Sequence, residues 1–422
     1  MSTLKSSAED LTINADGGSS DIKFQINAVE KASINSSGLL TSTTIDATAL
    51  TGNLPAIDGS SLTGNIGRKN MVINGNMQVA QRGTSASGVD TDSGATEGYR
   101  TVDRFIFGGL NSGIHTMTQD SETPVGFGSS IKIDCTTAKG SLDADSYLYI
   151  IHRIEAQDLQ QLGYGTSSPQ AITLSFWIRS PKTGTHYVEL FHGDSSGDVK
   201  RKNSYAYTIS SADTWEKQSM TFAGDTGLSA IDNDNGYGLM ITWYLAVGSN
   251  QQGGTNTNDN WHNTEANRCP GQVNCADSTS NNFYITGVQL ELGSVATDFE
   301  HRSYGEELAL CQRYYQHIVE GNTKMVGIAT WANTTQVNML LELSPIMRVR
   351  PSVDYTTGTD YWTISGSSGS DGSYDNLLIN SWSTERNIHL YSVTGTANGT
   401  AGYANYWFSH NASAKFALSA EL

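Results

Sequence analysis

Two stretches of the sequence set aromatic rings among polar side chains that can hold hydroxyl groups. The first is NTNDNWHNTE, around Trp261, and the second is YANYWFSHN, close to the end of the sequence. A flat ring can cover the apolar face of a sugar while its polar neighbours hydrogen-bond the sugar hydroxyls. For Trp261, plain packing within its own loop is the alternative. The pattern predicts glycan contacts from two groups of residues: Asp259, Asn260, Trp261 and His262, and Tyr403, Tyr406 and Trp407.

Two further patterns bear on catalysis. The GDSSG run at 193–197, preceded by His192, has the composition of a serine-protease motif, but no partner for the serine stands in a recognisable motif. Gly, Asp and Ser are also the residues that hairpin loops use. Paired carboxylates could serve a glycosidase, but with 42 acidic residues such pairs arise easily by chance. We expect no enzymatic activity, with a surface-polysaccharide depolymerase as the alternative. The carboxylates considered are Glu189, Glu216, Glu291 and Asp298.

No pattern in the sequence indicates a cofactor. The DNDNG run at 232–236 has the composition of a calcium loop, but an EF-hand needs Gly at position six and Glu at position twelve. Here Gly236 is fifth and Trp243 is twelfth, which excludes an EF-hand and leaves a structural calcium ion in an irregular loop open. Four cysteines are too few for a disulfide scaffold in 422 residues. Cys269 and Cys275 flank a Pro-Gly turn, and the sequence leaves open whether they are bridged.

The composition favours β structure with many turns. Hydrophobic residues make up 37% of the chain and charged residues only 16%, and there are 43 glycines. The formal net charge of −17 excludes naked nucleic acid as a partner, because neutralising phosphates requires clustered Lys and Arg. No apolar run approaches the roughly 18 residues of a membrane span, and no apolar signal region stands at the N-terminus. We therefore expect that the protein is made in the cytoplasm and does not insert into a membrane.

Residues 1–66 hold a repeat but little apolar bulk. Leu-Thr-Gly-Asn occurs at Leu50–Asn53 and again at Leu62–Asn65. Ile22, Phe24 and Ile26 alternate with polar residues, which predicts a strand. About 66 residues with so few large apolar side chains cannot close a core alone. We expect an intertwined trimeric β shaft, with a flexible linker as the alternative. In the shaft, these residues would pack against identical copies around one axis: Leu50, Leu54, Ile57, Leu62 and Ile66.

The rest of the sequence predicts two β domains. Strand-like runs such as SYLYIIHRI and YGLMITWYLAV recur with turn signals over residues 67–300, which favours a jelly-roll β-sandwich. Trp177 and Trp243 lie inside such runs and are expected in the core. The run IEAQDLQQLG, at 154–163, is a possible short helix that ends on Gly. Residues 319–422 predict a small C-terminal β-sandwich, so the chain as a whole is expected to be all-β.

A connector helix is expected over residues 301–318. Ser303 is an N-cap candidate, and Glu306 three residues later completes the pattern of a capping box. Apolar residues then follow at helical spacings of three and four, which makes one apolar stripe. The stripe consists of Leu308, Cys311, Tyr315 and Ile318.

Several stretches resemble a known family. NMVINGNMQVAQRGTS, followed by YRTVDRF, resembles the opening of a domain common in tail fibres and other appendages of tailed bacteriophages. ITGVQLELGSVATDFEHRSYGEELALCQRYYQ resembles the close of that domain, and LSFWIRSPKTGTHYVELF and TWEKQSMTF resemble its internal strands. The matches bracket residues 70–316, and the family's domain looks like a jelly roll of the carbohydrate-binding-module type. The repeated LTGN stretch resembles phage fibre shafts.

The resemblance implies a homotrimeric virion protein located in the tail. Such a tail fibre would attach to other phage tail proteins through residues 1–66 and face the host with its C-terminal tip. It would act as a receptor-binding adhesin for a host cell-surface glycan. A structural virion adaptor or head fibre without receptor binding is an alternative, besides the depolymerase.

Overall fold

This computed structural model describes residues 22–26, 29–34, 40–42, 68–194, 201–227, 230–256, 258–356, 358–366, 369–393 and 399–422. The chain divides into two compact units, Met1–Asn65 and Ile66–Leu422. In the first unit, β1 (Ile22–Ile26), β2 (Val29–Ile34) and β3 (Leu40–Ser42) form an antiparallel sheet in the order β1-β2-β3. The strand predicted at Ile22–Ile26 is therefore confirmed. The LTGN repeat and the shaft predicted from it lie outside the described residues.

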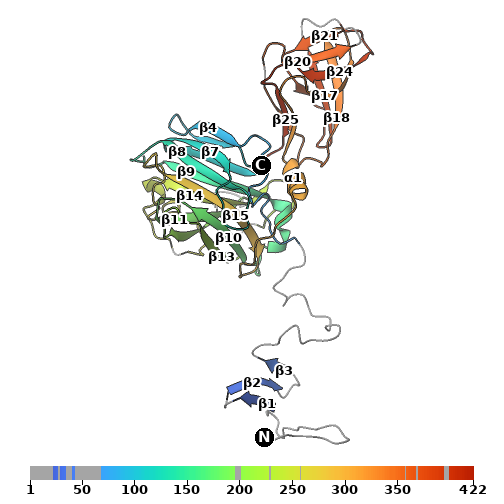
Figure 1. Cartoon of the computed structure of the whole chain (residues 1–422). Coiled ribbons are helices and arrows are strands. Elements are labelled where there is room, and N and C mark those ends of the chain that lie inside the picture. Colours follow the sequence, from blue (N-terminus) through green and yellow to red (C-terminus); the bar gives the residue numbers. More distant parts are fainter. Residues whose placement is uncertain are drawn as a thin grey trace, which may run out of the picture. The chain divides into compact units, whose positions relative to one another are not determined.

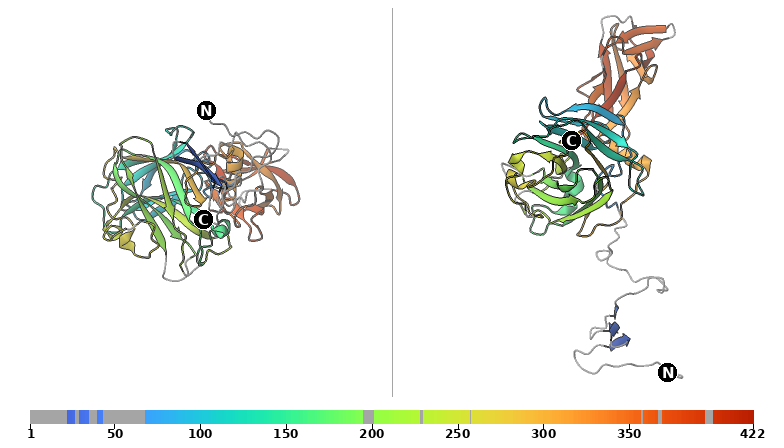
Figure 2. Two further views of the ribbon diagram at one scale, coloured as in Figure 1. Left: turned by 90° about the horizontal axis from the view of Figure 1, so that it is seen from below. Right: turned by 60° about the vertical axis from the view of Figure 1, so that its left-hand side comes forward.

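The second unit begins with two six-stranded antiparallel sheets that form a β-sandwich (Figures 1 and 2). The chain passes from sheet to sheet between β8 and β9, β9 and β10, and β10 and β11, as in a jelly roll. The predicted central jelly roll is thus confirmed. Sheet I consists of β13 (Glu216–Phe222), β10 (Ile172–Arg179), β15 (Asn282–Leu292), β8 (Ser130–Thr137), β7 (Ile114–Asp120) and β4 (Ser85–Asp90). Sheet II consists of β12 (Lys202–Ile209), β11 (Gly184–His192), β14 (Tyr237–Val247), β9 (Tyr147–Glu155), β6 (Phe105–Leu110) and β5 (Thr96–Tyr99).

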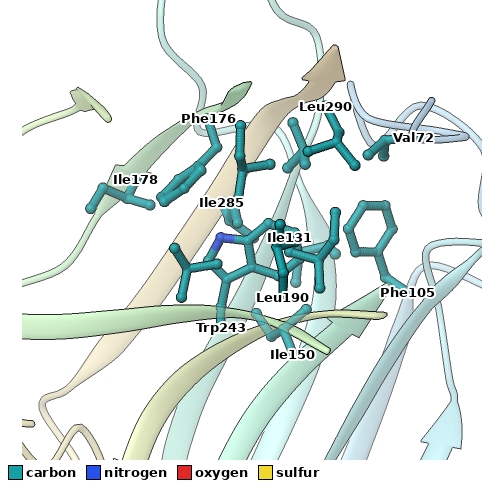
Figure 3. Packing of buried hydrophobic residues seen from close by; sticks show 14 of the residues in the cluster. Val72, Phe105, Ile131, Ile150, Phe176, Ile178, Leu190, Trp243, Ile285 and Leu290 are labelled. Carbon is teal, nitrogen blue, oxygen red and sulfur yellow. The ribbon is translucent and has the colours of Figure 1, made fainter. Parts of the chain in front are cut away.

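Alternation along the strands builds the core between the sheets. Figure 3 shows Phe176, Ile285 and other apolar residues of sheet I meeting Trp243 and Leu190 of sheet II. The Phe176 and Trp243 rings meet edge to face at 5.8 Å between centroids. Each fully buried side chain of this size stabilises the fold by roughly 1.5–3 kcal/mol. Trp243 is fully buried, as predicted. Trp177 is only partly buried, which corrects the prediction for that residue, because its neighbours Phe176 and Ile178 point into the core.

Both expected helices form, and both are shorter than the sequence indicates. Residues Ala156–Leu162 make a 3-10 helix that ends on Gly163 in the left-handed region, at φ 59°. Helix α1 spans Tyr304–Gln312, and the Ser303 hydroxyl accepts the Glu306 amide as the capping pattern predicts. The prediction that the helix continues beyond Gln312 to Ile318 is wrong. Tyr315 and Ile318 belong to β16 (Tyr315–Glu320), because pairing with the last strand overrides the local helical spacing.

A second, smaller sandwich follows, as predicted for residues 319–422; Figure 2 shows its strands in orange and red. Its core holds Trp362, Trp407, Phe416 and Leu418. The small sheet has the order β16-β25-β19 and the large sheet the order β21-β20-β24-β17-β18-β23-β22. The strands are β17 (Met325–Trp331), β18 (Gln336–Glu342), β19 (Ser352–Tyr355), β20 (Trp362–Gly366), β21 (Gly369–Tyr374), β22 (Leu378–Ile379), β23 (Asn387–Val393), β24 (Ala404–Ser409) and β25 (Lys415–Ser419).

The last residues of the chain join the two sandwiches. Glu421 pairs with Arg82 at 3.0 Å and also with the fully buried Arg104. The Arg104 guanidinium lies 3.5 Å from the centre of the Tyr314 ring, and Arg153 donates to the Leu422 carbonyl at 2.7 Å. These charged hydrogen bonds are among the stronger kinds in proteins. We call this cluster the joint.

Candidate functional site

The outer face of sheet II carries an open groove of about 360 Å³, which we call the sheet II groove. Side chains that alternate along β14 form the floor of the groove. Ile241 and Trp243 point into the core, so Met240 and Thr242 face outward. The loop that follows β14 closes one side of the groove with Gln251, Glu265 and Arg268. The opposite side comes from β9 and β5, through Tyr147, Tyr149, Arg153 and Glu97.

Tyrosine rings line one part of the groove. Tyr147 and Tyr149 stand two residues apart on β9, and their rings stack at 5.0 Å between centroids with an interplanar angle of 7°. Tyr244 of β14 meets Tyr149 edge to face at 6.4 Å. Burial raises the pKa of Tyr149 and of Tyr244, so both phenols stay neutral. The groove thus has an aromatic wall in which the Tyr149 and Tyr244 hydroxyls donate to Glu97 and Glu189.

A buried ion pair anchors the other side. The Glu189 carboxylate is fully buried and accepts hydrogen bonds from Ser204 Oγ at 2.8 Å and from Arg268 Nε at 2.9 Å and Nη2 at 2.5 Å. Arg268 Nη1 donates to Glu265 at 2.8 Å, and Lys202 Nζ also donates to Glu265. Because the buried Glu189 carboxylate is removed from solvent by the fold, its charge holds Arg268 firmly at the groove edge.

The rims of the groove are charged and more exposed. Glu97 accepts from Tyr149 Oη at 2.9 Å and from Arg153 Nη2 at 2.7 Å. In the described part of the chain, Thr242 Oγ1 and Gln251 Oε1 are buried without a hydrogen-bond partner. Such atoms are normally paired in folded proteins.

The carboxylates of the groove are engaged by cationic side chains. Burial alone would raise the pKa of Glu265, but the hydrogen bond from Lys202 and the charge of Arg268 hold it below its usual value. A general acid in glycoside hydrolysis needs a raised pKa instead. Glu189 and Glu97 are each engaged by an arginine.

The first predicted group of site residues lies beside the groove and serves the fold. Asp259 Oδ1 accepts the Ala223 amide at 2.6 Å, and Trp261 Nε1 donates to the Ala223 carbonyl at 2.8 Å. The Trp261 ring packs against the core, so the loop-packing alternative describes its contacts. His262 pairs through its backbone with Lys202, and Asn260 is exposed.

The second predicted group divides between surface and core. Tyr403 and Tyr406 are 66% and 54% exposed, whereas Trp407 is fully buried among the core residues of the C-terminal sandwich. Neighbours on a strand point to opposite faces, so Tyr406 outward requires Trp407 inward. The structure therefore corrects the prediction of a ligand contact from Trp407.

Sequence reasoning missed the sheet II groove because its residues come from distant parts of the chain. Glu97, Tyr149, Thr242 and Arg268 meet only when strands far apart in sequence pair in one sheet. One local signal was available. In SYLYIIHRI the tyrosines alternate with Leu148 and Ile150, which places Tyr147 and Tyr149 together on the face away from the core.

The other patterns singled out in the sequence give no second centre in the described residues. No group of three or more His, Cys, Asp and Glu side chains there could hold a metal ion. The four cysteines, Cys269 and Cys275 included, are buried free thiols, and burial raises the pKa of Cys275 to about 12. His192 pairs with Asp225 at 3.0 Å, but Ser195 and Ser196 lie outside the described residues. Within the described part, no helix has the length and apolarity to cross a membrane.

Comparisons with known proteins identify no family for this chain. No family model matches it, and no curated protein matches it. Among solved structures, it is similar to the enzymatically active domain of bacteriophage CBA120 tailspike protein 4, at 13% identity and a TM-score of 0.27, over 53% of this chain and 21% of that one. It is also similar to a putative sugar binding protein from Bacteroides thetaiotaomicron VPI-5482, at 12% identity and a TM-score of 0.28, over 53% of this chain and 100% of that one. A third is the CBM22-2 xylan-binding domain of Paenibacillus barcinonensis Xyn10C, at 13% identity and a TM-score of 0.27, over 49% of this chain and 98% of that one. Identities and TM-scores this low do not establish a common ligand.

Proposed function

We propose that this protein is a phage tail fibre or related virion appendage that binds a host-surface glycan in the sheet II groove. The observation that carries the proposal is the groove itself, in which tyrosine rings stand beside charged groups held by ion pairs. A sugar needs this combination, because one of its faces is apolar and its edge carries hydroxyls. The sequence resemblance to tail-fibre domains supports the virion context.

In this proposal, Tyr147 forms the platform for a sugar ring, and Tyr149 behind it keeps the platform rigid. Sugar hydroxyl groups meet charged residues at the rims. The Glu97 and Glu265 carboxylates accept hydrogen bonds from them, and the Arg153 guanidinium donates to them. Each groove is shallow and open, so one site alone would bind weakly. Three copies on one stalk would raise the overall affinity through effective concentration.

The proposal includes the assembly and location that the sequence indicates. Residues 1–66 would join three chains and connect them to other tail proteins, and the fibre would be made in the host cytoplasm before it enters the virion. We propose binding without catalysis, because the groove carboxylates are engaged by cations and the pKa of Glu265 is lowered. If the protein released reducing ends from the bound polysaccharide, the proposal of binding without catalysis would be wrong and the protein would be a depolymerase.

A glycan array probed with the full-length protein tests the groove. We expect Tyr147→Ala to weaken binding to the bound glycans by about tenfold, roughly the loss of 1.4 kcal/mol of contact energy. Tyr147→Phe keeps the ring and is expected to retain binding. Trp215→Ala removes an aromatic that packs against Tyr284 of sheet I and serves as the matched control.

Two results would overturn the proposed site. One is an array and a panel of bacterial surface polysaccharides on which the wild type binds nothing. The other is equal binding by Tyr147→Ala and the wild type, with thermal unfolding showing that both are folded.

A further inference from the structure

The C-terminal sandwich exposes a set of aromatic rings that its own core does not use. Trp382 follows β22 and is 81% exposed, more than either Tyr403 or Tyr406. It stands beside His389 and Tyr391, which share one face of β23 because they are two residues apart. We call these three side chains the Trp382 strip.

The three rings are nearly parallel. The Trp382 and His389 rings are 6.3 Å apart with an interplanar angle of 13°, and the His389 and Tyr391 rings are 6.4 Å apart at 23°. The rings of half-buried His389 and Tyr391 thus continue the exposed Trp382 ring in a row of similar orientation.

Hydrogen bonds fix the turn that carries Trp382. The Trp382 amide donates to Asn380 Oδ1 at 3.0 Å, and the Asn380 amide donates to the His389 carbonyl at 2.9 Å. Ser383 completes the turn: its amide donates to the Asn380 carbonyl at 3.0 Å, and its hydroxyl accepts the His389 amide at 2.8 Å. The ring is thus exposed and also held in place, so a ligand need not order this turn to bind there.

The surroundings of the strip are polar, and Arg350 donates to the Ser381 carbonyl at 3.0 Å, next to Trp382. Asn338 pairs with Tyr391 in the β18–β23 register, and its Oδ1 accepts a hydrogen bond from Gln336 at 2.9 Å. Arg386 pairs with Glu342 at 2.7 Å, so its charge is balanced. A contiguous group of exposed apolar side chains is the feature that marks a binding surface, and Trp382 adjoins His389 and Tyr391 here.

We propose that the Trp382 strip is a second carbohydrate site, one that takes an uncharged oligosaccharide along the row of rings. The negative faces of the rings attract the partly positive C–H bonds on the apolar face of a sugar. Carboxamides beside the strip hydrogen-bond hydroxyl groups at the sugar edge. This site lies in a different sandwich from the sheet II groove, so it stands or falls separately from the proposed function.

A second copy of this chain is the other occupant to separate. Leu340 pairs with His389 in the sheet and is 69% exposed, and Ile328 of β17 is 62% exposed. These aliphatic side chains extend the exposed face from His389 across β18 and β17. The strip itself favours sugar over protein, because its rings are aligned and carboxamides border them.

Four full-length variants on an array of defined neutral oligosaccharides test the proposal. We expect Trp382→Ala to lose about tenfold in binding to a subset of glycans that Tyr147→Ala still binds. Trp382→Phe is expected to keep most of that binding. Tyr304→Ala removes an exposed ring on α1 and is the matched control. Titration of a bound oligosaccharide should change the indole fluorescence of the wild type but leave that of Trp382→Ala unaltered.

Each outcome bears on the proposal. Equal array profiles for Trp382→Ala and the wild type would overturn it, as would a wild type that binds no neutral oligosaccharide. A lower solution mass for Trp382→Ala with unchanged glycan binding would also overturn it and assign the face to a second copy. If Tyr147→Ala alone has no effect, the groove fails while the strip stands.

Discussion

At the scale of single residues, the strongest dependence is that of Glu189 on Arg268. Glu189 is fully buried and its charge is met by that arginine. We expect Arg268→Ala to lower the free energy of unfolding by about 3–5 kcal/mol, because it leaves a buried carboxylate without its cation. Urea unfolding followed by tryptophan fluorescence measures the change. Arg386→Ala breaks an exposed pair with Glu342 and should lose only about 0–1 kcal/mol.

A double replacement sharpens this prediction. Glu189→Gln combined with Arg268→Met removes both charges and should recover part of the loss seen in Arg268→Ala. If Arg268→Ala is no more destabilising than Arg386→Ala, the buried pair is not what holds the groove edge.

Local residue patterns in the sequence did not predict the role of each aromatic residue correctly. The pattern of aromatic rings near polar groups predicted glycan contacts from both Tyr406 and its neighbour Trp407. Tyr406 is exposed and that contact stays a prediction, whereas the strand directs Trp407 into the core. Trp261 shows the second difficulty. Its loop looks open in sequence, yet its ring and indole nitrogen are used by contacts with Tyr164 and Ala223 that no local pattern reveals.

At the scale of elements, period-two alternation predicted the sandwiches well and helical spacing predicted α1 too long. Alternation is imposed by the pleat wherever one face is buried, so it can be read locally. The end of α1 is different, because Tyr315 leaves the helix to pair with Ser419 near the end of the chain. The residues of the sheet II groove are likewise far apart in sequence. Only the pair Tyr147 and Tyr149 on β9 could have been placed on one face from the sequence.

The segment before β6 predicts a pH dependence. Asp103 is buried beside Gln81 and Arg82, and burial raises its pKa from 3.8 to about 6 despite the charge of Arg82. Between these two values the folded state binds more protons than the unfolded state, so this group lowers stability as pH rises through that window. We expect Asp103→Asn to gain on the order of 1–3 kcal/mol relative to the wild type between about pH 4 and pH 6.

Thermal unfolding of both proteins across this pH range checks the effect. The difference between them should grow as pH rises and then level off above about pH 6. Asp213→Asn changes an exposed carboxylate beside Arg179, so its difference from the wild type should not follow this curve. A constant difference for Asp103→Asn would show that Asp103 does not titrate in this window.

At the scale of the whole molecule, the two units differ in what they can stabilise alone. The unit Ile66–Leu422 contains two cores, and Glu421 at the joint links them through Arg82 and Arg104. It therefore has the buried surface that an independent fold needs. Residues 1–66 offer few large apolar side chains in sequence, which is why we propose that three copies share one shaft.

The solution mass of the assembly follows from this contrast. Light scattering after size exclusion should give about three times 45.4 kDa for the full-length chain. A variant that begins at residue 67 should remain folded, since it keeps both cores, and should have the mass of a single chain. A single-chain mass for the full-length protein would contradict the shaft. A trimer that survives removal of residues 1–66 would move the assembly contacts to the sandwiches, and the exposed face beside Trp382 would then be the first surface to examine.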